Sequence, residues 1–137
     1  IGIEIFKYLR EIGNINTSRD LTFVTDTCDA FYKILKSDKL FGEVVNVGSD
    51  NDISIKDIIE KVSKILDKKI TIKKSFSRWR PIKSEVFRLR CDNKKILKYT
   101  NWKPKFSGKN GFDNGLSQTI EWFKNNKQFN KEKKYYV

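Results

Sequence analysis

The amino-acid sequence predicts an α/β fold of short strands and amphipathic helices, and two observations carry the prediction. Residues 43–47 and 70–72 are short β-branched segments, and an amphipathic helical segment opens between them at Ser54. Strand, helix and strand within about thirty residues form an α/β unit. No apolar run approaches the roughly 18 residues of a membrane-spanning helix, and nothing resembles a signal peptide, so we expect a soluble cytoplasmic protein without a membrane partner.

The N-terminal part is predicted to contain the end of a helix over 1–7 and a short strand over 8–12, closed by Gly13-Asn14. A helix is predicted over 25–37, because apolar and small residues recur there at helical spacing. The residues that make this pattern are Val24, Thr27, Cys28, Phe31 and Leu35.

The segment 43–47 lies between two glycines and is predicted to be a buried strand. Ser54 is predicted to cap the next helix, with Asp57 three residues on as a weaker form of the capping box. A further strand is predicted over 70–72. The helix between the two strands has a continuous apolar face of Ile55, Ile58, Ile59, Val62, Ile65 and Leu66.

The C-terminal part is predicted to contain two helices. Asp92 is a suitable N-cap for a short helix over 93–99. A last helix is predicted over 112–126, and 127–137 form a basic, frayed tail, so that 1–126 constitute one domain. The last helix carries Phe112, Leu116, Ile120 and Phe123 on one side.

The aromatic and sulfur-containing side chains have structural interpretations. Trp102 and Trp122 are predicted to pack under the last helix, and Trp79 to be a partly exposed loop residue. Cys28 and Cys91 fit no metal or redox spacing and are predicted to be buried apolar residues. With no His in the chain, we expect neither a metal site nor a catalytic triad.

The chain is strongly basic, with 29 Lys and Arg against 17 Asp and Glu and a net charge of +12. This charge keeps a small nucleic-acid-binding module as an alternative. However, 23 of the basic residues are Lys, and they are scattered rather than gathered in one tract. We therefore expect a solvated basic surface and no nucleic-acid partner. The chain has no Met, which leads us to expect a fragment of a longer protein.

Two arginines are candidates for binding an anion. Arg19 follows a polar turn, and Arg80 precedes Pro81, which restricts it to extended conformations. A guanidinium held by the backbone can bind an anion with two hydrogen bonds. The alternative for Arg19 is structural, either an ion pair with Asp20 or Asp26 or hydrogen bonds to nearby carbonyl groups, and Arg80 has the same alternative.

Several short motifs occur in one order along the chain and together resemble a known family. The set is similar to the C-terminal part of an extended short-chain dehydrogenase/reductase of the NAD-dependent epimerase/dehydratase family. Within it, the chain most resembles the GDP-N-acetylglucosamine 4,6-dehydratases of legionaminic acid biosynthesis. The motifs are Arg19-Asp20 with Val24 and Asp26, Asn46-Val-Gly48, Arg80-Pro81, Ser84-Glu-Val86, Asp92-Asn93, Asn101-Trp-Lys-Pro104, Gly115-Leu and Thr119-Ile-Glu-Trp122.

The resemblance implies a Rossmann-type α/β fold and three substrate-binding residues. Arg19 and Arg80 correspond to the arginines that reach the substrate diphosphate. Glu85 corresponds to an acid that hydrogen-bonds the nucleotide ribose, although it stands five residues after Arg80 and not three, as in many relatives. Asp26 and Asp92 also recur in the family pattern, and we interpret both as helix-start residues.

The resemblance also implies chemistry that these residues do not supply. Family members use NAD⁺ to oxidise the sugar at C4, after which water leaves across C5–C6 and hydride returns to C6. The glycine-rich turn that binds NAD and the Tyr-x-x-x-Lys pair are implied to lie upstream of Ile1. We therefore expect no catalytic or cofactor-binding residue here, an inactive fragment, and a homodimeric full-length enzyme. Tyr32…Lys36 and Tyr99…Lys103 match the spacing and are interpreted as chance.

Two functional hypotheses remain open beside the dehydratase. One is a nucleotide-sugar 4-epimerase of the same family, because the residues that distinguish the two reactions are implied to lie outside this chain. The other is the basic nucleic-acid-binding module, whose affinity would fall steeply with salt. The nucleotide base and the sugar are not determined by the sequence.

Overall fold

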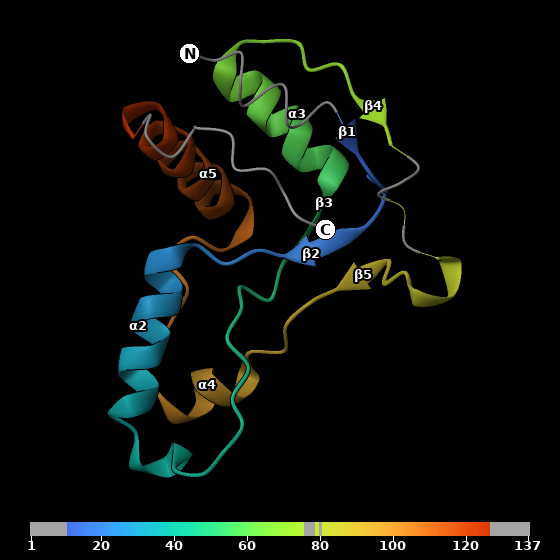
Figure 1. Cartoon of the computed structure of the whole chain (residues 1–137). Coiled ribbons are helices and arrows are strands. Elements are labelled where there is room, and N and C mark those ends of the chain that lie inside the picture. The colour runs from blue at the N-terminus through green and yellow to red at the C-terminus, as the bar shows by residue number, and fades with distance from the viewer. Residues whose placement is uncertain (1–10, 76–78, 80, 127–137) are drawn as a thin grey trace.

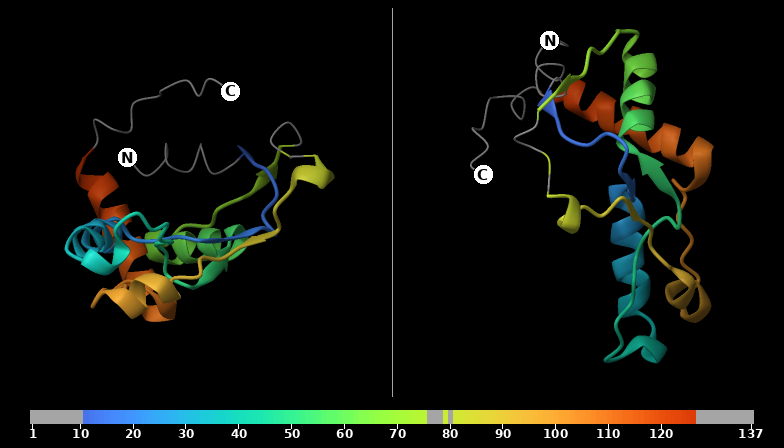
Figure 2. Two further views of the ribbon diagram at one scale, coloured as in Figure 1. Left: turned by 90° about the horizontal axis from the view of Figure 1, so that it is seen from below. Right: turned by 90° about the vertical axis from the view of Figure 1, so that its right-hand side faces the viewer.

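The computed structural model describes residues 11–75, 79 and 81–126 of the chain, and it consists of two small sheets and four α-helices (Figure 1). The three-stranded sheet separates two pairs of helices, with α3 and α5 toward one end and α2 and α4 toward the other (Figures 1 and 2). The helices are α2 (Val24–Leu35), α3 (Ile55–Leu66), α4 (Lys94–Tyr99) and α5 (Gly108–Asn125), and short 3₁₀ turns lie at Asp38–Leu40 and Ile82–Ser84.

Strand β2 (Ser18–Asp20) is the centre of the three-stranded sheet. It pairs antiparallel with β3 (Asp52–Ser54) and parallel with β5 (Arg88–Leu89). A separate parallel pair joins β1 (Glu11–Ile12) to β4 (Lys73–Lys74). The mixture of short strands and helices agrees with the predicted α/β class.

The four helices correspond to those that the sequence predicts. Helix α3 begins where its cap predicts, because Ser54 Oγ accepts a hydrogen bond from Asp57 N at 3.0 Å. The Ser54 hydroxyl in turn donates to Asp57 Oδ2 at 2.6 Å. Helix α5 begins at Gly108, one turn before the predicted position. The predicted helix over 1–7 and the tail over 127–137 lie outside the described residues.

The small core lies between α2 and α4. Ala30, Ile96 and Trp102 are almost fully buried there, and Val45 and Val47 pack against them. Trp102 is buried as predicted, although in the cluster of α2 and α4, whereas Trp122 is 48% exposed and its predicted burial is wrong. Trp122 lies about two turns beyond Gly115, past the part of α5 that approaches Phe23 and Phe106. Trp79 is 43% exposed, as predicted.

Two predicted strands differ from the structure. Residues 43–47 form an extended segment and not a strand, because no described strand lies beside them to complete a hydrogen-bonded ladder. The side chains still alternate, with Val45 and Val47 toward the core and Val44 85% exposed. The strand predicted over 70–72 is instead formed by the next two residues, Lys73–Lys74, which pair with β1 as β4.

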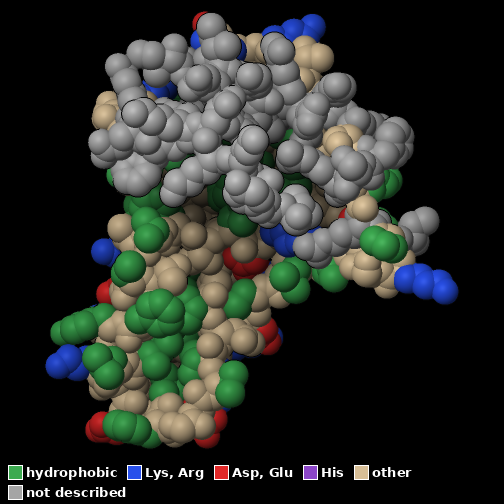
Figure 3. Space-filling view, in the orientation of Figure 1, with side chains coloured by type: hydrophobic (Ala, Val, Ile, Leu, Met, Phe, Trp, Pro, Cys, Tyr) green, Lys and Arg blue, Asp and Glu red, His purple; other side chains and the backbone are tan. Residues whose placement is uncertain are grey.

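The apolar stripe of α2 faces away from the core. Val24, Phe31 and Leu35 are 64%, 65% and 79% exposed, and Cys28 is also exposed, so its predicted burial is wrong. These four residues are called the α2 apolar face, and Figure 3 shows hydrophobic side chains gathered over this part of the molecule. The buried side of the helix is that of Asp26 and Ala30. Cys91 is partly buried.

No helix in the described part of the chain is long and apolar enough to cross a membrane.

Candidate functional site

Arg19 and Glu85 lie together on one face of the three-stranded sheet. The Arg19 guanidinium is 3.7 Å from the Glu85 carboxylate, and the two side chains are only 26% and 10% exposed. Adjacent strands bring them together: Arg19 is in β2, and Glu85 precedes β5, which runs parallel to it. Ser18 N extends this pairing by donating to Phe87 O at 2.8 Å. The structure thus joins two of the three predicted substrate-binding residues.

The strand geometry determines the face on which Arg19 lies. Side chains alternate between the two faces of a strand, so Arg19 points away from its neighbours Ser18 and Asp20. Its register partners are Ile53 on β3 and Leu89 on β5. Apolar neighbours thus flank a cation and an acid that are both largely shielded from water. The limited access of water strengthens the electrostatic interaction of either group with a ligand.

The Arg19 guanidinium retains capacity for a ligand while it faces Glu85. Its NH1 donates to Ser18 O at 2.7 Å, which fixes the side chain against its own strand. The 3.7 Å approach to Glu85 is electrostatic, since it is longer than a normal hydrogen bond. A guanidinium carries five N–H donors, so it can keep these contacts and still bind a phosphate oxygen.

The two acids considered as alternative partners of Arg19 are engaged elsewhere. Asp20 accepts hydrogen bonds from Ser49 and from Cys91 N. The buried Asp26 carboxylate accepts from the backbone N–H groups of Lys105 and Phe106, at 3.0 and 2.8 Å. The observed ion pair of Arg19 is thus with Glu85, which the sequence alone does not reveal.

Arg80 lies outside the described residues, so its assignment to the diphosphate stays a prediction. The chain after it forms a 3₁₀ turn, in which Ser84 N donates to Pro81 O at 2.8 Å. This turn leads directly into Glu85 and β5. The Arg-Pro motif is therefore joined through a single turn to the segment that carries the acid.

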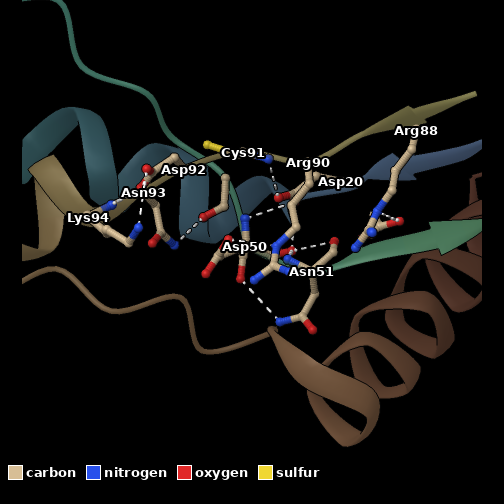
Figure 4. A network of polar contacts seen from close by, with 12 residues as sticks. Asp20, Asp50, Asn51, Arg88, Arg90, Cys91, Asp92, Asn93 and Lys94 are labelled. Carbon is tan, nitrogen blue, oxygen red and sulfur yellow. Dashed lines mark hydrogen bonds and ion pairs between the residues drawn. The ribbon is translucent and has the colours of Figure 1, made fainter. Parts of the chain in front are cut away.

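A polar network that the sequence analysis missed supports β2 from the other face (Figure 4). We call Asp20, Gly48, Ser49, Cys91 and Asn93 the Asp20 network. Asp20 Oδ1 accepts from Ser49 N at 2.9 Å and from Ser49 Oγ at 2.7 Å, and its Oδ2 accepts from Cys91 N at 3.1 Å. The buried Asn93 side chain donates to Gly48 O at 2.9 Å.

Gly48 allows the two loops of this network to touch. A Cβ atom at position 48 would lie 2.3 Å from the Cys91 Cβ, which only a glycine avoids. Burial raises the pKa of the Cys91 thiol, and the negative charge of Asp20 raises it further. The signals in the sequence were the strings Asn46-Val-Gly48 and Cys91-Asp-Asn93, whose spatial proximity no local pattern reveals.

Two ion pairs border the network. Asp52 accepts hydrogen bonds from Arg88 at 2.9 and 2.8 Å and from Ser18 Oγ at 2.6 Å. These bonds, that of Arg88 foremost, lower the pKa of Asp52 to about 2. Asp50 pairs with Arg90 at 2.8 Å, and this hydrogen bond lowers the pKa of Asp50. Both arginines of this segment therefore have carboxylate partners.

The two predicted helix-start acids have different roles. Asp92 Oδ1 accepts from Lys94 N at 3.0 Å at the beginning of α4, as a helix-start residue does, although the structure places the cap itself at Asn93. Asp26 lies in the first turn of α2, but its carboxylate binds the backbone before α5. The interpretation of Asp26 as only a helix-start residue is incomplete.

Two hollows on the described part of the surface have linings that include neither Arg19 nor Glu85. One of about 440 Å³ lies between the end of α2 and α4 and is lined by Tyr32, Lys36 and Tyr99, among others. Lys36 Nζ lies 5.8 Å from the centre of the Tyr32 ring, a cation–π contact on an exposed helix. Another hollow, of about 230 Å³, lies between β3 and α5.

The sequence contains no G-x-x-G-x-x-G turn of the kind that binds a dinucleotide. Among the residues that the structure describes, no three His, Cys, Asp or Glu side chains form a possible metal site.

Comparison with known proteins identifies relatives of both reaction types. The chain is 28% identical over 131 residues to dTDP-glucose 4,6-dehydratase of Escherichia coli, covering 90% of this chain and 35% of that protein. It is 31% identical over 121 residues to UDP-glucuronate 4-epimerase of Thermodesulfobacterium geofontis, covering 88% and 34%. The chain thus spans about a third of the length of the curated relatives it matches.

Solved structures agree on the fold. The NAD complex of dTDP-glucose 4,6-dehydratase from Bacillus anthracis matches with a TM-score of 0.76 and 22% identity, over 93% of this chain and 38% of that one. This likeness confirms the predicted Rossmann-type α/β fold. The family model described as GDP-mannose 4,6 dehydratase matches residues 6–115, which include Arg19, Glu85 and the Asp20 network. Because this match covers most of the chain, the protein belongs to the GDP-mannose 4,6-dehydratase family of extended short-chain dehydrogenases/reductases.

Proposed function

We propose that this chain is the substrate-binding part of an NAD-dependent nucleotide-sugar 4,6-dehydratase. Arg19 and Arg80 bind the diphosphate of the substrate, and Glu85 hydrogen-bonds the ribose. NAD is bound by a part of the enzyme that these residues do not form, and the 137-residue chain alone is inactive. The complete enzyme is a cytoplasmic homodimer, and 127–137 form a tail outside the 1–126 domain.

The observation that carries the proposal is the pairing of Arg19 with Glu85. Two residues far apart in sequence are brought onto one sheet face, both more than two-thirds shielded. A nucleoside diphosphate carries anionic phosphates next to ribose hydroxyl groups. A fixed cation can bind the phosphates, and a neighbouring carboxylate can accept hydrogen bonds from the hydroxyls. The family match and the relatives that act on nucleotide sugars support the same substrate class.

The motif order supports a finer assignment to GDP-N-acetylglucosamine and legionaminic acid synthesis. A second reaction, 4-epimerisation, is favoured by the 31% identical UDP-glucuronate 4-epimerase. Incubating the full-length protein with NAD and GDP-N-acetylglucosamine, followed by NMR of the product, separates the two. Loss of water gives a 4-keto-6-deoxy sugar, whereas epimerisation returns an isomer with C6 unchanged.

The binding site is tested by calorimetric titration of the full-length protein with GDP, UDP and dTDP. Arg19→Ala and Arg80→Ala should each weaken binding of the preferred diphosphate by about 10- to 100-fold, since a hydrogen bond to a charged group contributes about 1.5–3 kcal/mol. NAD affinity should change by less than about 2-fold, because the cofactor lies elsewhere.

Arg90→Ala is the matched control, because Arg90 pairs with Asp50 and is 47% exposed. It should leave diphosphate affinity unchanged. Equal loss of diphosphate and NAD binding in Arg19→Ala would contradict the assignment. Tight, steeply salt-dependent binding of single-stranded DNA that survives both arginine substitutions would instead support the nucleic-acid module.

A further inference from the structure

The side chains on the two faces of strand β2 contact different groups. Arg19 points to the face that carries Glu85, and Asp20, by the alternation of a strand, points to the other. The opposite face also carries Ser18 and Asp52, which hydrogen-bond each other at 2.6 Å. The side chain next to Arg19 therefore contacts the interior network and not the ligand face.

The Asp20 carboxylate continues the connection between β2 and β5 where their backbone ladder stops. The last register pair of the two strands is Arg19 with Leu89. One residue beyond, Asp20 Oδ2 accepts from Cys91 N at 3.1 Å. A side chain thus supplies the hydrogen bond that keeps the two chains together just past Arg19.

The other oxygen of the same carboxylate fixes a third segment. Asp20 Oδ1 accepts one hydrogen bond from the backbone N–H of Ser49 and one from its hydroxyl group, and Ser49 is only 7% exposed. Gly48 presses this turn against Cys91, with no room for a Cβ atom. Asp20 therefore fastens the end of β2 to two tightly packed loops by three hydrogen bonds.

We propose that Asp20 is a positioning residue, which holds Arg19 in register with Glu85 so that both meet one nucleoside diphosphate. This inference rests on the proposed function. A parallel pair as short as β2 and β5 has few backbone hydrogen bonds to resist sliding or twisting of one strand. Rotation of β2 would carry Arg19 away from Glu85, and misplacement of a binding group by about 1 Å suffices to lose much of its effect.

The test is a double-mutant cycle in the full-length protein, read by calorimetric titration with the nucleoside diphosphate that it binds best. Asp20→Asn should weaken binding about 5- to 50-fold, because the amide cannot accept at both ends. In an Arg19→Ala background, Asp20→Asn should change the affinity by less than about 2-fold. A residue that acts only on folding would not lose its effect in this way.

Ser49→Ala provides a milder second variant if Asp20→Asn does not fold. It removes one of the three hydrogen bonds and keeps the backbone donor, so a smaller loss of affinity with the same dependence on Arg19 is expected. Asn93→Ala is the matched control, because its bond to Gly48 O lies in the same network without touching β2. It should lower the melting temperature without changing the affinity of the folded protein.

The outcomes separate the two proposals. If Arg19→Ala leaves diphosphate binding unchanged, the proposed function of this face fails. If Arg19→Ala weakens binding but Asp20→Asn does not, or weakens it equally with and without Arg19, only the positioning role of Asp20 is overturned.

Discussion

The Asp26 carboxylate joins the beginning of α2 to the loop that leads into α5. Its two oxygens accept the N–H groups of Lys105 and Phe106, and its backbone oxygen accepts the Trp102 indole N–H at 3.0 Å. The residue is only 3% exposed, so these donors have no ready access to water. One acidic residue thereby fixes two backbone N–H groups and the indole of the core tryptophan.

Removing this carboxylate should destabilise the fold. Asp26→Ala leaves two backbone donors without their acceptor, each costing about 1–3 kcal/mol, so we expect a loss of about 2–4 kcal/mol of unfolding free energy. Asp26→Asn should cost less, because the amide oxygen can still accept one bond. Chemical denaturation followed by tryptophan fluorescence measures both. The exposed Asp38 serves as control, and an equal effect of Asp38→Ala would contradict the structural role of Asp26.

At the scale of the element, the antiparallel pair β2–β3 and the neighbouring β5 are linked through Asp52. Its carboxylate bridges Ser18 of β2 and Arg88 of β5 while its backbone belongs to β3. All three strands of the sheet therefore depend on one ionised side chain. Hydrogen bonds from Arg88, and secondly from Ser18, hold the pKa of this carboxyl at about 2.

This depressed pKa predicts acid sensitivity of the sheet. Because the unfolded chain binds a proton at its ordinary pKa and the folded chain only near 2, stability is fully present above about pH 4 and is lost as pH falls toward 2. Melting temperatures between pH 5 and 2 should fall less steeply in Asp52→Asn than in the unmodified protein. Arg88→Gln should flatten the dependence too, and an unchanged slope in both variants would count against this linkage.

The elements differ in how far the sequence could predict them, and the difference has a physical cause. Helix α3 is predictable because its apolar period and its Ser54 cap are local features. The segment 43–47 has a strand's composition, but a strand exists only with a neighbour, and none of the described strands pairs with it. The apolar stripe of α2 likewise predicts the helix correctly but not which side of it is buried, because burial depends on what packs against the helix.

The same reasoning applies to the candidate site. Arg19 and Glu85 were predicted as substrate-binding residues from their motifs, yet their contact with each other depends on the register of β2 and β5. The members of the Asp20 network lie within short motifs, but no local pattern reveals that these motifs meet, since they come from three separate parts of the chain. Sequence motifs thus indicate which residues matter, and the fold determines which of them act together.

At the scale of the whole molecule, the α2 apolar face is an exposed apolar surface that the described residues do not cover. Val24, Phe31 and Leu35 are more than 60% exposed on one side of a single helix, and Phe41 and Val44, which follow α2 in the chain, are exposed as well. Contiguous apolar patches of this kind mark contact surfaces or sites of aggregation. The chain covers about a third of its relatives' length, so a protein of the relatives' size would have further polypeptide that could cover this face.

We therefore expect the 137-residue polypeptide alone to bind a hydrophobic dye and to aggregate, despite its net charge of +12. The double variant Phe31→Lys with Leu35→Lys should abolish dye binding and yield monomer in light scattering, because it places charge on the α2 apolar face. The control Asn114→Lys with Gln118→Lys adds the same charge to exposed positions of α5 and should still aggregate. If both double variants restored solubility equally, general charge repulsion and not this face would govern aggregation.

In a full-length protein that covers the face, Phe31→Lys should instead lower the melting temperature, since it would bury a charge in an apolar contact.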